Sequence, residues 1–447
     1  MHQAGWLYCA RAFFEQALRT SADEVKVLAS LGAVQCDLRQ YQSGEASCRR
    51  ALDVQPASAL ALNNLGNALK LQERFSEARE CYQRAVELEP QLLPAVLNLG
   101  SLAEDLGLPH EAERWYRRAL QIAPRSAEAN FNLAMLLLQA GDWQRGWQGF
   151  EYRFQRSARA LLAAEPPRPG LRRWEPDDGL AGKRILVRAE QGLGDMIQFV
   201  RFAPLLHGMG ARVFLSVHRP LAALLRTVDG VEQVCVLGRE ASLPQMDCWI
   251  PALSVPRCLR VDEKTIPAAV PYLRTDPALS RKWADRLRRH GATRRIGIAW
   301  SGSPTHNNDR YRSMAPGTLA TLARAVARAD TVYFGLGEAR LPEAARRSGL
   351  LPLGPLADFA ELAALVQHLD LVITVDTAFA HLAGALARPV WLLLPLNCDW
   401  RWLRERSDSA WYPTMRLYRQ RALGDWSGVM EQVARDLDIL AASSKAA

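Results

Sequence analysis

A glycine-rich turn near the middle of the chain carries an acidic residue that could act in proton transfer. The segment EQGLGDMIQFVRFAP, residues 190–204, follows an apolar, strand-like run and begins a helical pattern. In a parallel sheet, this order places loop amides and a helix start at the carboxyl edge of the strands. The third glycine of a dinucleotide-binding loop is missing, because Ile197 stands there. We expect Asp195 to act as a general base, with Gly192 and Gly194 as loop contacts; a helix N-cap is the alternative for Asp195.

A second turn of this kind is DTAFAHLAGAL, residues 376–386, directly after the strand-like run DLVITV. The free N–H groups at the start of the helix predict an anion site that suits a diphosphate. Asp376 could bind sugar hydroxyls, or it could cap the helix. His381 could contact the same ligand, or it could be a packed core histidine. The donor-side residues predicted here are Asp376, Thr377, Ala378, Phe379 and His381.

Two further loops follow expected strands and carry polar residues. The segment WSGSPTHNNDRYRSM, residues 300–314, is rich in Asn, His and Arg, and its arginines could neutralise a leaving diphosphate. In FGLGEAR, residues 334–340, Glu338 could accept hydrogen bonds from ribose hydroxyls. The contacts predicted for the first loop are Ser301, His306, Arg310 and Arg312.

Short β-rich runs alternate with helical stretches from residue 183 onward, which is typical of parallel sheets with crossover helices. We expect one Rossmann-like half over 183–293, a second over 294–424, and a closing helix and tail over 425–447. A stretch rich in Arg, Pro and Gly predicts a linker over 157–182. The expected strands are 184–189, 212–217, 233–238, 247–252, 295–300, 331–337, 370–375, 389–394 and 415–419.

The first third of the chain repeats with a period of 34 residues. Similar residue types recur at six offsets in three copies, and the small ones let paired helices approach closely. In one copy these positions are Leu65, Gly66, Ala78, Tyr82, Ala85 and Pro90. We expect an α-solenoid over 1–156, with a partial first unit, full units over about 25–58, 59–92 and 93–126, and a divergent cap over 127–156. Because the chain begins inside a unit, we expect a longer natural N-terminus.

Asparagine recurs on the first helices of these units, although it is a poor helix former. The concave face of a solenoid typically holds a protein segment. We therefore expect an amide ladder that hydrogen-bonds the backbone of a protein or peptide partner; inter-helix contacts within the repeats are the alternative. These residues are Asn63, Asn64, Asn67, Asn98, Asn130 and Asn132.

Composition excludes several classes of protein. The 447-residue chain is 49% hydrophobic and 23% charged, so disorder is not its dominant state. Its apolar runs are shorter than a membrane span and its start lacks a signal-peptide pattern, so we expect a cytoplasmic protein with no membrane span. Eight cysteines without a C-x-x-C pair argue against a zinc, redox or disulfide framework, and we expect no metal and no cofactor. The net charge of +9 comes with no nucleic-acid-binding motif, so we expect no nucleic-acid partner.

The repeats resemble the tetratricopeptide repeat, and residues 183–420 resemble the heptosyltransferase-like glycosyltransferases of family 9. In that family a G-D segment ending in proline carries the catalytic aspartate, and D-T-x-x-x-H-L after a strand binds the donor diphosphate and sugar. The lipopolysaccharide enzymes of the family place a lysine in the loop after the first strand of the second half, where Arg312 is the nearest match. The matching positions here are Gly194, Asp195, Pro204, Asp376, Thr377, His381 and Leu382.

Two further segments, WRWL at 400–403 and WYPTMRLYRQ at 411–420, resemble those of bacterial proteins that fuse this domain to tetratricopeptide repeats. The resemblance implies a GT-B fold, with the acceptor on the first half and the nucleotide sugar on the second. It also implies a metal-independent inverting displacement in which Asp195 deprotonates the acceptor hydroxyl as the nucleotide diphosphate leaves.

Three functions stay open at this point. The first is a protein glycosyltransferase whose repeats present the polypeptide acceptor. The second is a heptosyltransferase-like enzyme that acts on lipopolysaccharide or another glycan. The third is a non-catalytic repeat scaffold with a vestigial transferase domain. A homo-oligomer is compatible with each of them.

Overall fold

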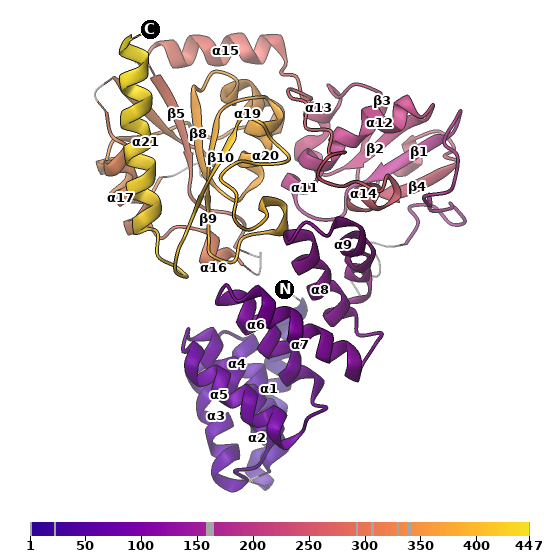
Figure 1. Cartoon of the computed structure of the whole chain (residues 1–447), viewed down its shortest axis with the longest axis vertical. Coiled ribbons are helices and arrows are strands. Elements are labelled where there is room, and N and C mark those ends of the chain that lie inside the picture. The colour runs from indigo at the N-terminus through magenta and orange to yellow at the C-terminus, as the bar shows by residue number, and fades with distance from the viewer. Residues whose placement is uncertain are drawn as a thin grey trace. The chain divides into compact units, whose positions relative to one another are not determined.

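The chain divides into two compact units, Met1–Leu136 and Leu137–Ala447. A computed structural model describes residues 2–21, 24–157, 165–291, 294–304, 308–328, 330–337 and 341–446. In the described part, the first unit is helical and the second contains two sheets with covering helices (Figure 1). The predicted fold class, a helical repeat solenoid followed by two α/β halves, is confirmed.

The helices of the first unit follow the 34-residue period. Small residues allow the two helices of a unit to pack closely: Gly66 faces the ring of Tyr82, and Gly100 faces the ring of Tyr116. Both tyrosines are fully buried. The helices are α1 His2–Thr20, α2 Val25–Asp37, α3 Tyr41–Val54, α4 Ala59–Leu71, α5 Phe75–Leu88, α6 Leu93–Asp105, α7 Pro109–Ile122 and α8 Ala127–Gln139.

The second helix of the predicted repeat cap lies in the second unit. This helix is α9, Trp143–Phe150, and a 3-10 turn, η1 Glu151–Gln155, follows it. Both Trp143 and Trp147 are buried. The predicted cap over 127–156 is therefore divided between the two compact units.

The first sheet is parallel, with strand order β3-β2-β1-β4. Its order reverses between β1 and β4, and ligands in such sheets bind at the carboxyl ends of the strands at this switch point. Its elements are β1 Arg184–Arg188, α11 Leu193–Phe199, η2 Val200–Phe202, α12 Ala203–Gly208, β2 Arg212–Val217, η3 Arg219–Leu221, α13 Ala222–Leu225, β3 Val231–Val236, η4 Glu240–Ser242, β4 Cys248–Pro251, η5 Ala252–Ser254 and α14 Val255–Cys258.

The second sheet is also parallel, with order β10-β9-β8-β5-β6-β7. Every residue of β8 and β9 is buried, as expected of strands covered on both faces. Figure 1 shows α17 and α21 at one side of this sheet and α19 and α20 at the other. The elements are α15 Pro277–Arg288, β5 Arg294–Ala299, α16 Asp309–Arg312, α17 Pro316–Val326, β6 Thr331–Gly335, α18 Glu343–Arg347, β7 Leu350–Pro352, α19 Phe359–Val366, β8 Leu371–Val375, α20 Ala378–Ala385, β9 Val390–Leu394, η6 Trp400–Trp402, β10 Met415–Arg419 and α21 Ser427–Ala446.

The strands follow the sequence closely, with small differences. The strand expected at 233–238 begins two residues earlier, at Val231, and the one expected at 331–337 ends at Gly335. The short edge strand β7 has no counterpart among the expected strands. Among the described residues, no helix is both long and apolar enough to cross a membrane.

The close approach of paired helices gives a prediction for the repeats. A Cβ on Gly100 would lie 2.4 Å from the Tyr116 ring, whereas a Cβ on Gly5 would meet nothing within 4 Å. We expect Gly100→Ala to lower the stability of the first unit by about 1–3 kcal/mol through overpacking. Gly5→Ala, the matched control, should raise it by roughly 0.5–1 kcal/mol through helix propensity. Urea unfolding followed by circular dichroism measures both, and equal effects would contradict the packing.

Candidate functional site

The two glycine-rich and acidic turns predicted from the sequence meet in the structure. Gly194, in the first turn of α11, lies against the start of α20 from the other half. A Cβ on Gly194 would be 2.8 Å from Cδ2 of His381 and 3.3 Å from the backbone Cα of Ala378. Only a residue without a side chain allows this approach. The switch points of the two sheets therefore face one another through these helix starts.

Asp195 uses both carboxylate oxygens. Oδ2 accepts a hydrogen bond of 2.7 Å from the backbone N–H of Gly192, the N-cap of α11. Oδ1 accepts one from Nη2 of Arg401, at 2.5 Å. Asp195 is therefore not the N-cap residue that the sequence offered as an alternative: Gly192 holds that position, and Asp195 stands at N3 and accepts from the N-cap N–H. Its side chain remains 19% exposed, and each carboxylate oxygen can accept a second hydrogen bond.

Arg401 is the functional candidate that the sequence reasoning missed. Its guanidinium is buried, and it also donates to Oδ1 of Asp399 at 2.9 Å and to Oε1 of Gln198. Burial opposes its positive charge, but Asp399 and Asp195 raise the pKa of Arg401 above its ordinary value. The cation stays charged and joins the two halves, because Gln198 lies on α11 and Asp399 in the second half. The only sequence signal for it was its place in the WRWL segment.

Asp376 directly follows β8 and lies beside these groups. Burial and the negative charge of Asp399 raise the pKa of Asp376 to about 6, while Trp402, Arg312 and Arg401 partly oppose this rise. Arg312 donates from Nη1 to the Asp376 backbone carbonyl at 3.0 Å and from Nε to Asp309 at 3.2 Å. The structure therefore brings Arg312 and Asp376 together, as the sequence analysis expected of donor-side residues.

The start of α20 has the form predicted for it. Thr377 is the N-cap, and its Oγ1 accepts a hydrogen bond from the N–H of Phe379 at 3.4 Å. Thr377 is buried, whereas Ala378 and Phe379 are partly exposed. The ring of Phe379 lies against Gly337, which has a positive φ of 109°. Free N–H groups at this helix start carry the positive end of the helix dipole.

His381 is packed in the core, which is one of the two roles that the sequence analysis gave for it. It is buried, its Nδ1 is 2.9 Å from the hydroxyl oxygen of Tyr412, and its ring stacks on Trp402 with centroids 5.5 Å apart. Burial and the nearby guanidinium groups of Arg401 and Arg201 hold its pKa well below the ordinary value. The imidazole is therefore neutral at physiological pH.

The remaining predicted contacts are less closely gathered. Arg310 is exposed and lies over the ring of Tyr311 at 4.4 Å, and Ser301 is partly buried. Neighbouring Gly302 donates its N–H to Ser313 at 2.9 Å, which holds the start of this loop to its end. Two predicted residues, His306 and Glu338, lie outside the described residues.

The repeat asparagines are engaged within the repeats. Asn63 donates to Asn64 at 3.0 Å, Asn64 to the Ala29 carbonyl at 3.0 Å, and Asn98 to Asn63 at 2.9 Å. Asn67 accepts from the Tyr82 hydroxyl. These are the inter-helix contacts that formed the alternative to a peptide-binding ladder.

Asn130 and Asn132 also hydrogen-bond within the repeats, Asn130 close to the start of its own helix and Asn132 to the neighbouring helix α7. Asn130 donates to the backbone carbonyls of Pro124 and Ser126 at 3.1 and 2.9 Å. Asn132 is a hydrogen-bond partner of the Tyr116 hydroxyl. A role of these amides in peptide binding stays a prediction.

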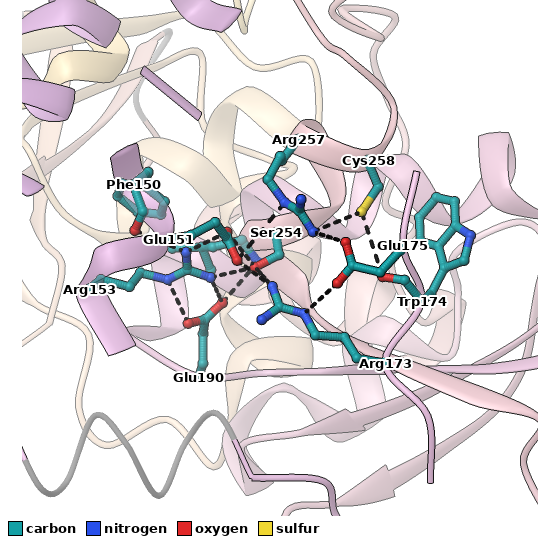
Figure 2. Close-up of polar contacts among 11 residues, drawn as sticks. Phe150, Glu151, Arg153, Arg173, Trp174, Glu175, Glu190, Ser254, Arg257 and Cys258 are labelled. Carbon is teal, nitrogen blue, oxygen red and sulfur yellow. Dashed lines mark hydrogen bonds and ion pairs between the residues drawn. The ribbon is translucent and has the colours of Figure 1, made fainter. Parts of the chain in front are cut away.

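A buried network of ion pairs holds the other end of the Asp195 loop (Figure 2). Arg153 of η1 forms a fork with Glu190: Nε donates to Oε2 and Nη2 to Oε1, both at 2.9 Å. Both side chains are 4% exposed. Nη2 of Arg153 also donates to Ser254 at 2.7 Å, and Oε1 of Glu190 also accepts from the N–H of Leu253. Glu190 is thereby fixed just before the glycine-rich turn.

The same network extends into the segment before the first sheet. Arg173 reaches both Glu151 and Ser254, and Arg257 donates to Glu175 at 2.6 Å (Figure 2). The charges of Arg153 and Arg173 hold the pKa of Glu151 below its ordinary value against the effect of burial. The described residues contain no group of three or more His, Cys, Asp or Glu side chains that could hold a metal ion.

Comparisons with known families match both parts of this architecture. Residues 59–92, 93–126 and 115–148 match tetratricopeptide repeats. Residues 325–393 match glycosyltransferase family 9 (heptosyltransferase). The chain therefore carries tetratricopeptide repeats and a glycosyltransferase family 9 domain. The resemblance stated from the sequence is confirmed for the repeats over 59–148 and for the family 9 domain over 325–393. The matched segment includes β8, Asp376 and the start of α20, whereas the Gly194–Asp195 turn lies outside it.

A curated relative is Protein FlbA of Caulobacter vibrioides, 30% identical over 337 residues, which are 69% of this chain and 55% of the relative. The chain thus spans about half the length of that relative. Among solved structures, a family 9 glycosyl transferase from Veillonella parvula aligns with 60% of this chain and 99% of its own, at 14% identity and a TM-score of 0.46. The PilF protein of Pseudomonas aeruginosa aligns with 36% of this chain and 74% of its own, at 24% identity and a TM-score of 0.31.

The raised pKa of Asp376 predicts a pH dependence of stability. Its pKa is about 6 in the folded protein and about 4 in an unfolded chain. The folded state therefore binds more protons between these values, and this carboxyl lowers stability as the pH rises from about 4 to 6. Asp376→Asn removes the titration. We expect the stability of the variant relative to wild type to rise by on the order of 1–3 kcal/mol across this window.

Urea unfolding midpoints at pH 4, 5, 6 and 7 measure this difference. Asp425→Asn is the control, because hydrogen bonds from Ser427 lower the pKa of Asp425 instead. For that control the relative stability should not rise over the same range. A flat profile for Asp376→Asn would show that the carboxyl is already ionised at pH 4.

The Arg153–Glu190 fork gives a further prediction. Arg153→Leu leaves Glu190 and Glu151 buried without their main cation, so we expect a loss of about 3–5 kcal/mol in the stability of the second unit. Arg435→Leu is the matched control, because Arg435 is 65% exposed and pairs with Glu431, which is also exposed, at 3.8 Å. Its effect should stay within about 0.5 kcal/mol. Chemical denaturation of both variants tests this, and similar small losses would contradict the network.

Proposed function

We propose that this protein is a glycosyltransferase that moves a sugar from a nucleotide-diphosphate sugar to a protein acceptor. The observation that carries the proposal is the contact of Gly194 with the start of α20, which sets the carboxylate of Asp195 beside the helix start that follows Asp376. A base and an anion-binding helix start from opposite halves are the two groups that a sugar transfer needs. The family 9 domain match over 325–393 supports the same chemistry.

The proposed reaction is a single inverting displacement. Asp195 accepts the proton of the acceptor hydroxyl, whose oxygen attacks the anomeric carbon as the bond to the diphosphate oxygen breaks. The N–H groups at 377–379 and the guanidinium of Arg312 stabilise the negative charge on the leaving diphosphate. Asp376 binds sugar hydroxyls. No metal ion takes part in this scheme.

The acceptor side of the proposal depends on the repeats. A polypeptide would lie on the concave face of the solenoid, where such repeats typically hold extended segments. The amides predicted to bind it already hydrogen-bond within the repeats, so the polypeptide would have to use their remaining donors and acceptors. There are two alternatives to a protein glycosyltransferase. One is transfer to lipopolysaccharide or another glycan, and the other is a scaffold without activity. A cytoplasmic location stays a prediction.

The donor site is tested by binding. Thermal unfolding of wild type and Asp376→Asn is followed with ADP-heptose and with UDP-, GDP-, CMP- and dTDP-sugars. One nucleotide sugar should raise the melting temperature of wild type, since a ligand that binds only the folded state stabilises it. The same ligand should stabilise Asp376→Asn less, and Asp425→Asn as much as wild type. No shift with any donor would refute the donor site.

The role of Asp195 is tested by turnover. With the donor identified, release of the nucleoside diphosphate is measured in the presence of candidate protein and glycan acceptors. We expect Asp195→Asn to lower turnover by about 10²–10⁴-fold while donor binding is retained, because the variant loses the proton acceptor and keeps the donor-side groups at the start of α20. Unchanged turnover in Asp195→Asn would overturn its role as the base.

A further inference from the structure

The three residues of the η6 turn point in three different directions. A 3-10 helix has three residues per turn, so consecutive side chains are about 120° apart. Trp400 packs on α9, Arg401 reaches Asp195 and Gln198 on α11, and Trp402 stacks on His381 of α20. One short turn therefore touches the last helix of the repeat cap, the acceptor-side helix and the donor-side helix.

The turn is held rigidly at both ends. Asp399 caps its start, because Oδ1 accepts from the backbone N–H of Arg401 at 3.0 Å as well as from its guanidinium. Leu403 ends it with a positive φ of 53°, a conformation that L residues with side chains rarely adopt. The N–H of Leu403 bonds back to the Trp400 carbonyl at 3.1 Å. A strained residue persists only where its surroundings fix it, so the direction of the Arg401 side chain is set by this backbone.

Trp400 is fixed by an aromatic cluster from α9. Its ring centroid lies 5.1 Å from that of Trp147, 6.2 Å from Trp143 and 6.3 Å from Phe150, each edge to face. All these rings are buried. Trp147 is anchored in turn by a hydrogen bond of 2.9 Å from Nε1 to the Val261 carbonyl of the first half. The packing of α9 therefore determines where the η6 turn lies.

Arg401 links the position of the η6 turn to the position of the Asp195 carboxylate. Its Nη2 and Nε bind two side chains one turn apart on α11, Asp195 and Gln198. Oε1 of Gln198 accepts from Nε of Arg401, whereas the buried Nε2 of Gln198 has no hydrogen-bond partner among the described residues. A shift of the η6 turn therefore disturbs both hydrogen bonds from Arg401 to α11.

We propose that Arg401 is a positioning residue for Asp195, and that Trp400, through its packing on α9, sets the position of Arg401. This inference rests on the proposed function, in which Asp195 is the base. In this proposal α9 is part of the transferase unit. The position of α9 determines the rate of proton transfer and does not affect donor binding. A misplacement of a catalytic group by about 1 Å costs turnover on the order of 10²-fold, so small changes at α9 act on the rate.

The test compares three conservative variants in the full-length protein. Arg401→Lys keeps the charge but loses the planar fork, and Trp400→Phe loses ring contacts with α9. Trp283→Phe is the matched control: Trp283 is as buried as Trp400, lies on α15 and packs against the guanidinium of Arg286. Melting temperatures are recorded for all three, so that losses of stability are known before rates are compared.

Turnover and KM for the donor give the first readout. We expect turnover to fall about 10- to 100-fold in Arg401→Lys and several-fold in Trp400→Phe, with the donor KM changed by no more than about threefold. Trp283→Phe should keep wild-type turnover. Equal turnover in Trp400→Phe and Trp283→Phe, or a loss that falls on the donor KM alone, would overturn the proposal.

Hydrogen exchange gives the second readout and does not require activity. The N–H of Gly192 donates a hydrogen bond to Asp195. Displacement of the carboxylate would break this bond and reduce the protection of the first turn of α11 against exchange. Peptides that cover 190–199 should exchange at least about threefold faster in Arg401→Lys and Trp400→Phe than in wild type and Trp283→Phe. Unchanged exchange would overturn the proposal. If wild type shows no turnover with any donor, the proposed function fails, and the exchange result alone decides the positioning role.

Discussion

The arrangement of the site depends on one buried cation, Arg401. A guanidinium removed from water needs acceptors on every side, and it costs several kcal/mol to leave one of its charged partners uncompensated. Its acceptors come from both halves: Asp195 and Gln198 on α11, and Asp399 beside η6. The two halves can satisfy this cation only in the register in which α11 meets α20. The absence of a side chain at Gly194 is what makes that register sterically possible.

The loop that carries Asp195 is held at both of its ends by arginine. Arg153 binds Glu190 before the loop, and Arg401 binds Asp195 after it. The first arginine comes from η1, directly after α9, and the second lies beside Trp400, which packs on α9. The last helix of the repeat cap thus contributes to both restraints. This explains in physical terms why α9 belongs to the compact unit of the two sheets.

Much of the fold could be predicted from local patterns. The 34-residue period gave the repeat helices, and continuous apolar runs such as 371–375 and 390–394 gave the buried parallel strands. The edge strand β7 was missed because three residues, Leu350–Pro352, are too few to form a pattern. The position of α9 was also missed. The sequence analysis placed this segment in a divergent repeat cap, and only the tertiary structure shows that Trp143 and Trp147 pack against Trp411 and Trp400.

The candidate site also contains residues that local sequence patterns reveal and residues that depend on contacts distant in sequence. Asp195, Asp376 and Thr377 could be singled out because strand, turn and helix start are adjacent in sequence. Arg401 could not, since its partner Asp195 lies 206 residues away and no local pattern records their pairing. The asparagines show the converse: their recurrence is visible in the sequence, but their hydrogen bonds to one another and to Ala29 depend on how the helices stack.

The most direct test of this account is the coupling energy between Asp195 and Arg401. A double-mutant cycle with Asp195→Asn, Arg401→Gln and the double variant, followed by urea unfolding of the second unit, isolates their pairwise interaction. If the buried pair fixes the register of the two halves, the summed losses of unfolding free energy in the two single variants should exceed the loss in the double variant by at least about 1.5 kcal/mol. Additive losses would contradict the account, because they would mean that the two groups do not interact in the folded protein.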